Sequence, residues 1–200
     1  MAAQNRVTPA GDIVAIDQRG LFMGNRGSIH RGRTIVRPWQ VRRWITCVLR
    51  YKDWVAPMWA PGRWTALFFW DEAVALAAGH RPCALCRHAD HVRWLDAWEE
   101  AFGERPRVDP MDRRLHAERV DGRAKRVHDA PWAGLPDGAF AVVDDTPVLV
   151  LADRIVPWSP AGYAPPGARP SRGRATVLTP PATLGVLRHG YRPVVHPTAR

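Results

Sequence analysis

Two of the three cysteines in this chain, Cys83 and Cys86, stand two residues apart in the segment Gly-His-Arg-Pro-Cys-Ala-Leu-Cys-Arg-His at positions 79–88. Two sulfurs at this spacing on a tight turn can both face one tetrahedral ion, at about 2.3 Å each. The pair therefore predicts a metal site, and zinc is the expected ion. A redox dithiol and two unreactive core thiols are the alternatives that the spacing leaves open.

The residues before the pair predict a short helix. Residues 71–78 are rich in alanine, with acidic side chains in the first turn, and Gly79 can adopt the left-handed conformation that ends a helix. The string from Phe68 to Arg87 combines aromatic residues, this helix, Ala-Gly-His and Arg-Pro-Cys-x-x-Cys followed by a basic residue. It resembles the metal-binding domain of the Ada family of DNA-repair proteins, with the match covering about residues 64–88.

The resemblance implies two further zinc ligands from an upstream segment. Residues 22–31 resemble the variant of that segment in which histidine is the first ligand, which places His30 there. Thr34 stands where the family has a second cysteine, so we expect the remaining thiol, Cys47, to complete the site. In the Ada family one zinc thiolate accepts a methyl group from a DNA phosphotriester, and that position falls at His30. His88 and His91, which would share one face of a following helix, are the alternative ligands.

Composition limits the class of protein. Of 200 residues 46% are apolar and ten are tryptophan, enough for a hydrophobic core. Three cysteines do not make a disulfide framework. Residues 1–17 show no basic start followed by an apolar run, and no stretch approaches the roughly 20 apolar residues of a membrane span. We therefore expect no membrane partner and a cytoplasmic location.

Positive charge is concentrated in one stretch. The net charge is +10, and between residues 19 and 63 ten basic residues accompany a single acid, Asp53. Tryptophans are interleaved with the arginines, and planar guanidinium groups suit phosphate oxygens. We therefore predict a nucleic-acid partner, DNA rather than RNA, contacted by Arg31, Arg33, Arg37, Arg42 and Arg43. The alternative is a solvated arginine surface above buried tryptophans.

The layout predicts an α+β protein with a small zinc-bound N-terminal module and a β-rich C-terminal module. We expect a loose arm over residues 1–18, the cysteine-bearing module over 19–102 and a charged linker over 103–130, or an exposed helix followed by a turn at 121–122. Residues 131–200 are expected to form the β-rich module with one short helix. Its clearest signal is the pair of apolar runs 140–143 and 148–151 around Asp-Asp-Thr-Pro, which is typical of a β-hairpin.

These patterns favour a zinc-dependent nucleic-acid-binding protein with a role in DNA repair or modification. A second hypothesis is a hydrolytic enzyme, a nuclease or deaminase, that uses zinc with His116, Glu118 or the C-terminal histidines. Deaminases carry H-x-E before P-C-x-x-C, whereas here it follows. A third is an interaction module in which zinc only stabilises the fold. Four protein ligands favour binding or structure, while three ligands and a water favour an enzyme. The sequence leaves the oligomeric state open.

Overall fold

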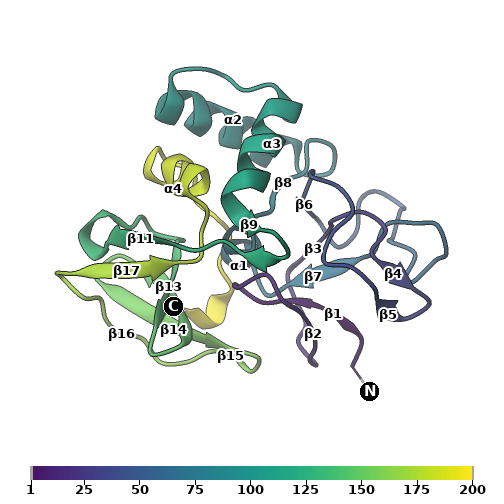
Figure 1. Ribbon diagram of the computed structural model, residues 1–200, viewed down its shortest axis with the longest axis horizontal. Coiled ribbons are helices and arrows are strands. Elements are labelled where there is room, and N and C mark those ends of the chain that lie inside the picture. The colour runs from purple at the N-terminus through teal and green to yellow at the C-terminus, as the bar shows by residue number, and fades with distance from the viewer. Residues whose placement is uncertain (1, 200) are drawn as a thin grey trace.

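The computed structural model describes residues 2–199, and in these it shows four α-helices and two large sheets (Figure 1). The strands of the first sheet have the spatial order β2-β1-β7-β3-β6-β8. Strand β1 is parallel to β7 and β6 is parallel to β8, while the other pairs are antiparallel. The bounds of these strands are β1 (Gln4–Val7), β2 (Ile13–Ala15), β3 (Phe22–Asn25), β6 (Ile45–Cys47), β7 (Leu67–Phe69) and β8 (Arg81–Pro82).

The second sheet is built from the C-terminal third of the chain. Its order is β11-β17-β12-β13-β14-β15, and β16 pairs with β14 beside this path. Asp144 and Asp145 both have positive φ, 45° and 59°, as a two-residue hairpin turn between β12 and β13 requires. The bounds are β11 (His128–Pro131), β12 (Phe140–Val143), β13 (Thr146–Leu151), β14 (Arg154–Ser159), β15 (Gly162–Tyr163), β16 (Gly167–Ala168) and β17 (Arg174–Val177).

Helix α1 (Glu72–Ala77) lies between the two sheets and is buried along its whole length (Figure 1). Ala73, Val74 and Ala77 pack against the second sheet, and Ala75 packs against the first. Small apolar residues on every side suit a helix that has no solvent face. The Asp71 side chain caps the helix by accepting a hydrogen bond from the Val74 N–H at 2.9 Å.

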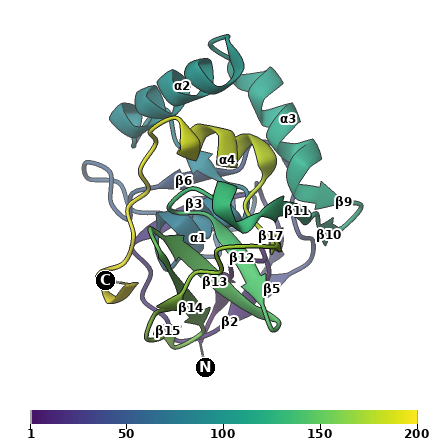
Figure 2. The same cartoon turned by 90° about the vertical axis from the view of Figure 1, so that its left-hand side faces the viewer.

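Three longer helices cover one end of the molecule (Figure 2). They are α2 (His88–Phe102), α3 (Val108–Arg119) and α4 (Pro181–Arg188). Trp94 and Trp98 of α2, Met111 and Leu115 of α3 and apolar residues of α4 form one shared core cluster. Short elements complete the chain: the hairpins β4 (His30–Arg31)–β5 (Thr34–Ile35) and β9 (Val120–Asp121)–β10 (Ala124–Lys125), and the 3₁₀ turns η1 (Trp132–Gly134) and η2 (Pro197–Ala199). Within residues 2–199, no helix is both long and apolar enough to cross a membrane.

The mixed α+β class and the hairpin over 140–151 agree with the sequence analysis, but two segments differ from it. Residues 4–15 are not a loose arm, because β1 pairs with β7 and β2 pairs with β1 in the first sheet. Residues 103–130 are not an open linker either. They hold α3, which packs on α2 and α4, and then the β9–β10 hairpin around Gly122, so the helix-and-turn alternative describes them better.

Candidate metal centre

Three cysteine sulfurs meet at the edge of the first sheet. The Sγ atoms of Cys47, Cys83 and Cys86 all lie within 4.8 Å of one another, and they are the one such group of potential ligands found in the described part of the chain. Cys47 ends β6 and is buried, whereas Cys83 and Cys86 are half-buried in the turn between β8 and α2. The structure thus brings together a pair close in sequence and a third thiol 36 residues upstream of Cys83.

Backbone pairing brings the distant thiol to the pair. Gly79 ends the α1 segment with φ +92°, which turns the chain back toward the first sheet. Strand β8 then runs parallel to β6, and the N–H of Cys83 donates to the carbonyl of Thr46 at 2.9 Å. Because Cys47 directly follows Thr46, this register sets its sulfur beside that of Cys83.

The turn between the paired cysteines supplies donors to sulfur. The N–H of Leu85 points to Sγ of Cys83 at 3.4 Å, and the N–H of Arg87 closes the turn on the carbonyl of Cys83 at 3.1 Å. Hydrogen bonds from the other two thiols lower the pKa of Cys83, while bonds to Cys83 and Cys86 raise the pKa of Cys47. Of the three thiols, Cys83 is therefore the one whose ionisation these hydrogen bonds favour.

Two buried arginines anchor the cysteine turn on either side. Arg81 makes a bidentate pair with Asp112 of α3, both contacts being 2.8 Å. Arg87 pairs with Glu72 of α1 at 2.8 Å and donates to the Thr46 hydroxyl, also at 2.8 Å. Neither acid could be predicted as an arginine partner, since nothing in the residues around Glu72 or Asp112 indicates which arginine each contacts.

The histidines predicted as further ligands do not join the three sulfurs. His30 lies in the β4–β5 hairpin, where Nδ1 is 2.7 Å from the Thr65 hydroxyl and the ring packs edge-on against Trp59. His88 is exposed, with Nδ1 near the carbonyl of Ala84. His91 is buried on α2, and burial lowers its pKa. The expected four-ligand set is thus reduced to three thiols from this chain, because the hairpin of His30 is separate from the sheet that carries Cys47.

The two residues of the H-x-E pair, His116 and Glu118, contact Trp44, Arg114 and the start of α4. Glu118 pairs with Arg114 at 3.0 Å and accepts from the N–H of Ala182 at the start of α4. The ring of His116 lies against Trp44, and burial beside Arg119 lowers its pKa to about 4. Neither residue belongs to the group of ligand atoms around the sulfurs.

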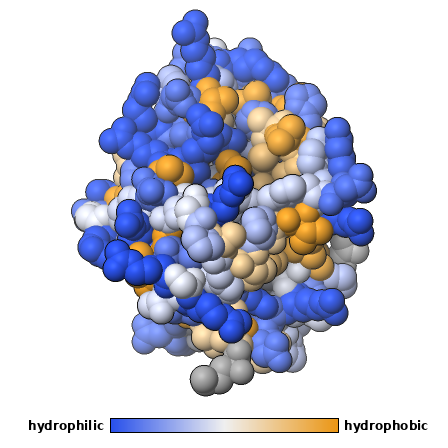
Figure 3. Space-filling view, turned by 90° about the vertical axis from the view of Figure 1, so that its right-hand side faces the viewer, coloured by the Kyte–Doolittle hydropathy of each residue, from blue (hydrophilic) through white to orange (hydrophobic). Residues whose placement is uncertain are grey.

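Four of the five arginines predicted to contact nucleic acid are exposed and form no ion pair within residues 2–199: Arg31, Arg33, Arg37 and Arg42. Arg43 differs, because it pairs with Asp109 and Asp112 of α3. The face that carries β4 and β5 is mostly hydrophilic, with separate hydrophobic patches (Figure 3). Of the interleaved tryptophans, Trp44 is core and Trp54 is the most exposed. No family model, curated protein or solved structure was found to match this chain.

Proposed function

We propose that this chain binds one zinc ion through Cys47, Cys83 and Cys86, and that the zinc-bound protein binds nucleic acid through its exposed arginines. The observation that carries the proposal is the meeting of three sulfurs within 4.8 Å. In a tetrahedral site with Zn–S distances near 2.3 Å, the sulfurs lie about 3.8 Å apart. Small side-chain movements therefore suffice to bind the ion, and an all-sulfur donor set favours zinc over hard cations.

The fourth coordination position is left to a ligand from outside this set. His30 is engaged with Thr65, and neither His88 nor His91 reaches all three sulfurs. Cys83 and Cys86 are half-buried, so that a water molecule or a small external ligand can approach the ion from their side. Three thiolates and one zinc ion carry one net negative charge, which keeps the thiolates electron-rich.

Zinc would fix the position of part of the arginine-rich stretch. The ion would join β6 to the turn after β8, and Arg42 and Arg43 lie just before β6. The carbonyl of Arg42 already accepts a hydrogen bond from buried Arg119. Loss of the metal should therefore loosen this end of the arginine surface as well as the cysteine turn.

Phosphate is the ligand group that the exposed arginines suit. Among residues 2–199, Arg31, Arg33 and Arg42 have no carboxylate partner, so binding a phosphate would not require breaking an ion pair there. Each guanidinium presents a planar fork of donors to phosphate oxygens. Such contacts carry no sequence information, and they make affinity depend steeply on salt. The preference for DNA over RNA rests on the resemblance to the Ada domain.

Fluorescence anisotropy with labelled duplex DNA, repeated with duplex RNA, tests this proposal. We expect log Kd to change linearly with log salt, and replacement of Arg31 and Arg33 by glutamine to reduce the slope by roughly one to two units. The matched control replaces Arg19 and Arg172, two exposed arginines far from this hairpin in sequence, and should leave the slope nearly unchanged. No binding of either duplex at about 50 mM salt would contradict the nucleic-acid part.

A zinc-dependent hydrolase is the second candidate, because three protein ligands and an open position are typical of catalytic zinc. Against it, no histidine or carboxylate from residues 2–199 joins the group around the sulfurs to serve as general base. Incubating zinc-loaded protein with DNA and RNA, with Cys86→Ser as control, distinguishes the two candidates. Zinc-dependent cleavage that is lost in the variant would favour the hydrolase, while binding without cleavage would favour the first proposal.

A further inference from the structure

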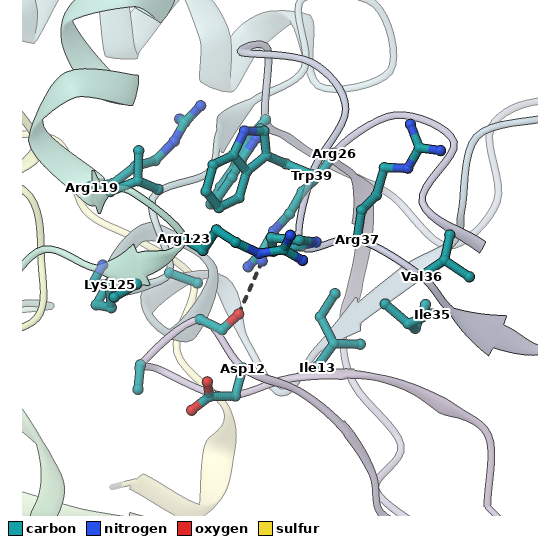
Figure 4. Close-up of a pocket in the computed structure, with 17 residues that line it drawn as sticks. Asp12, Ile13, Arg26, Ile35, Val36, Arg37, Trp39, Arg119, Arg123 and Lys125 are labelled. Carbon is teal, nitrogen blue, oxygen red and sulfur yellow. Dashed lines mark hydrogen bonds between the residues drawn. The ribbon is translucent and has the colours of Figure 1, made fainter.

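A cavity of about 480 Å³ opens where β2, the segment 35–39 and the β9–β10 hairpin meet (Figure 4). Its wall contains five cationic side chains and a single carboxylate, that of Asp12. The cations are Arg26, Arg37, Arg119, Arg123 and Lys125. This charge balance disfavours a cationic or apolar ligand and favours an anion.

Two of these cations are buried and incompletely bonded. Arg26 and Arg119 are only 2% and 1% exposed, and their guanidinium groups lie 4.1 and 3.9 Å from the ring of Trp44. Each donates to a backbone carbonyl, Arg26 to Gly11 at 3.0 Å and Arg119 to Gly79 at 2.7 Å. Nη2 of Arg26 and Nε of Arg119 nevertheless have no hydrogen-bond partner in the described part of the chain. Buried charged groups with unpaired donors are costly, and because both arginines line the cavity, an anion there would offset part of the cost of burying their charge.

Capping of helix α1 explains only some of the five cationic side chains that line the cavity. Lys125 donates to the carbonyl of Ala77 and Arg119 to that of Gly79, so both satisfy carbonyls at the C-terminal end of α1. Capping does not account for Arg26, which donates to the carbonyl of Gly11 and not to a carbonyl of α1. It also does not account for Arg37 and Arg123, which are exposed at the cavity and make no ion pair in the described chain.

The cavity also offers an aromatic wall. Trp39 and Trp44 both line it, with ring centroids 5.9 Å apart, and Trp39 is only half-buried. A base could stack on an exposed indole face, an interaction of about 1–3 kcal/mol in nucleic-acid complexes. The volume lies within the usual range of about 300–1,000 Å³ for small-molecule sites.

We propose that this cavity binds a nucleotide unit bearing a phosphomonoester, with Arg26 and Arg123 on the phosphate and Trp39 on the base. The ligand chemistry is the same whether the unit is a free mononucleotide or the phosphorylated end of a nucleic-acid strand. The proposal goes beyond the arginine surface and the zinc centre. Arg37 is shared with the predicted nucleic-acid-binding arginines, but Arg31, Arg33 and the cysteines do not line the cavity.

Isothermal titration of the full chain with AMP, GMP, CMP and UMP tests the proposal, with adenosine and inorganic phosphate as partial ligands. We expect at least one mononucleotide to bind at least about tenfold more tightly than either partial ligand. Arg123→Glu and Trp39→Ala should each weaken that binding by about tenfold or more. Arg172→Glu, which changes net charge equally outside the cavity, should leave the affinity within about twofold. Thermal unfolding of each variant checks that it is folded.

A second arm identifies the source of the nucleotide. Single strands with a 5′-phosphate, a 3′-phosphate or neither end phosphorylated compete against the mononucleotide. A phosphorylated strand that competes better than the free nucleotide assigns the cavity to strand ends, and the reverse order assigns it to mononucleotides. The proposal is overturned if no mononucleotide binds at millimolar concentration, if phosphate alone binds as well, or if Arg172→Glu weakens binding as much as Arg123→Glu. Because duplex binding through Arg31 and Arg33 is measured separately, either proposal can fail alone.

Discussion

Asp112→Ala should be among the most destabilising substitutions in the helical part of the molecule. Both oxygens of Asp112 accept from Arg81 at 2.8 Å, and the two side chains are only 5% and 2% exposed. Removing the carboxylate leaves a buried guanidinium without its counter-ion, which costs about 3–5 kcal/mol. That is a large share of the roughly 5–15 kcal/mol by which domains are stable.

Asp109→Ala is the matched control on the same helix. Asp109 also pairs with an arginine, Arg43 at 2.9 Å, but these side chains are 72% and 56% exposed. Exposed pairs of this kind contribute about 0–1 kcal/mol. Urea unfolding followed by tryptophan fluorescence, with zinc present throughout, measures both variants. Losses that differ by less than about 1 kcal/mol would refute the reasoning. The double change Arg81→Met with Asp112→Leu should recover much of the loss, since neither position then holds an unpaired buried charge.

Two further predictions concern the end of α1. Gly79→Ala should lower the free energy of unfolding in urea by at least about 2 kcal/mol, because a Cβ there would lie 2.4 Å from Cδ of Arg119. The control is Gly103→Ala, which is also at positive φ but faces open space and should cost only about 1 kcal/mol. Burial, with Arg26 and Arg119 nearby, lowers the pKa of Lys125 to about 7. Between about pH 7 and 9 the Lys125 side chain keeps its proton in the unfolded chain but loses it in the folded chain. The free energy of unfolding should therefore rise with pH, by at most about 1.4 kcal/mol per pH unit. Lys125→Met should flatten this rise, and an equal rise in the variant would contradict the assignment.

Elements with local signals could be predicted from the sequence. The capped, alanine-rich α1, the tryptophan spacing of α2 and the hairpin of β12 and β13 all follow from residues within one element. Strands β1 and β2 could not be predicted, because they are only 4 and 3 residues long and β1 pairs with a strand about sixty residues later. The burial of Asp112 and Arg119 likewise could not be predicted from the polar sequence of α3, because it depends on partners in the α1–β8 region.

The three-cysteine cluster was predictable in part. Cys83 and Cys86 are identified by spacing, and Cys47 by being the remaining cysteine. His30 was predicted as a ligand from the upstream spacing of the Ada pattern, but in this fold residues 30–35 form a separate hairpin. The cationic cavity had no motif to indicate it, since its residues come from six separate segments and its buried arginines have no local signal that distinguishes them from surface charge.

The proposed function depends above all on a zinc ion held by three thiolates of one chain. X-ray absorption at the zinc edge, on protein purified with zinc and dialysed free of excess metal, tests it most directly. We predict about one zinc per chain, with three sulfur neighbours at about 2.3 Å and one nitrogen or oxygen neighbour at about 2.0 Å. Cys47→Ser should lose one sulfur neighbour or the metal itself. Protein without zinc after this treatment, or zinc with no sulfur neighbours, would contradict the account.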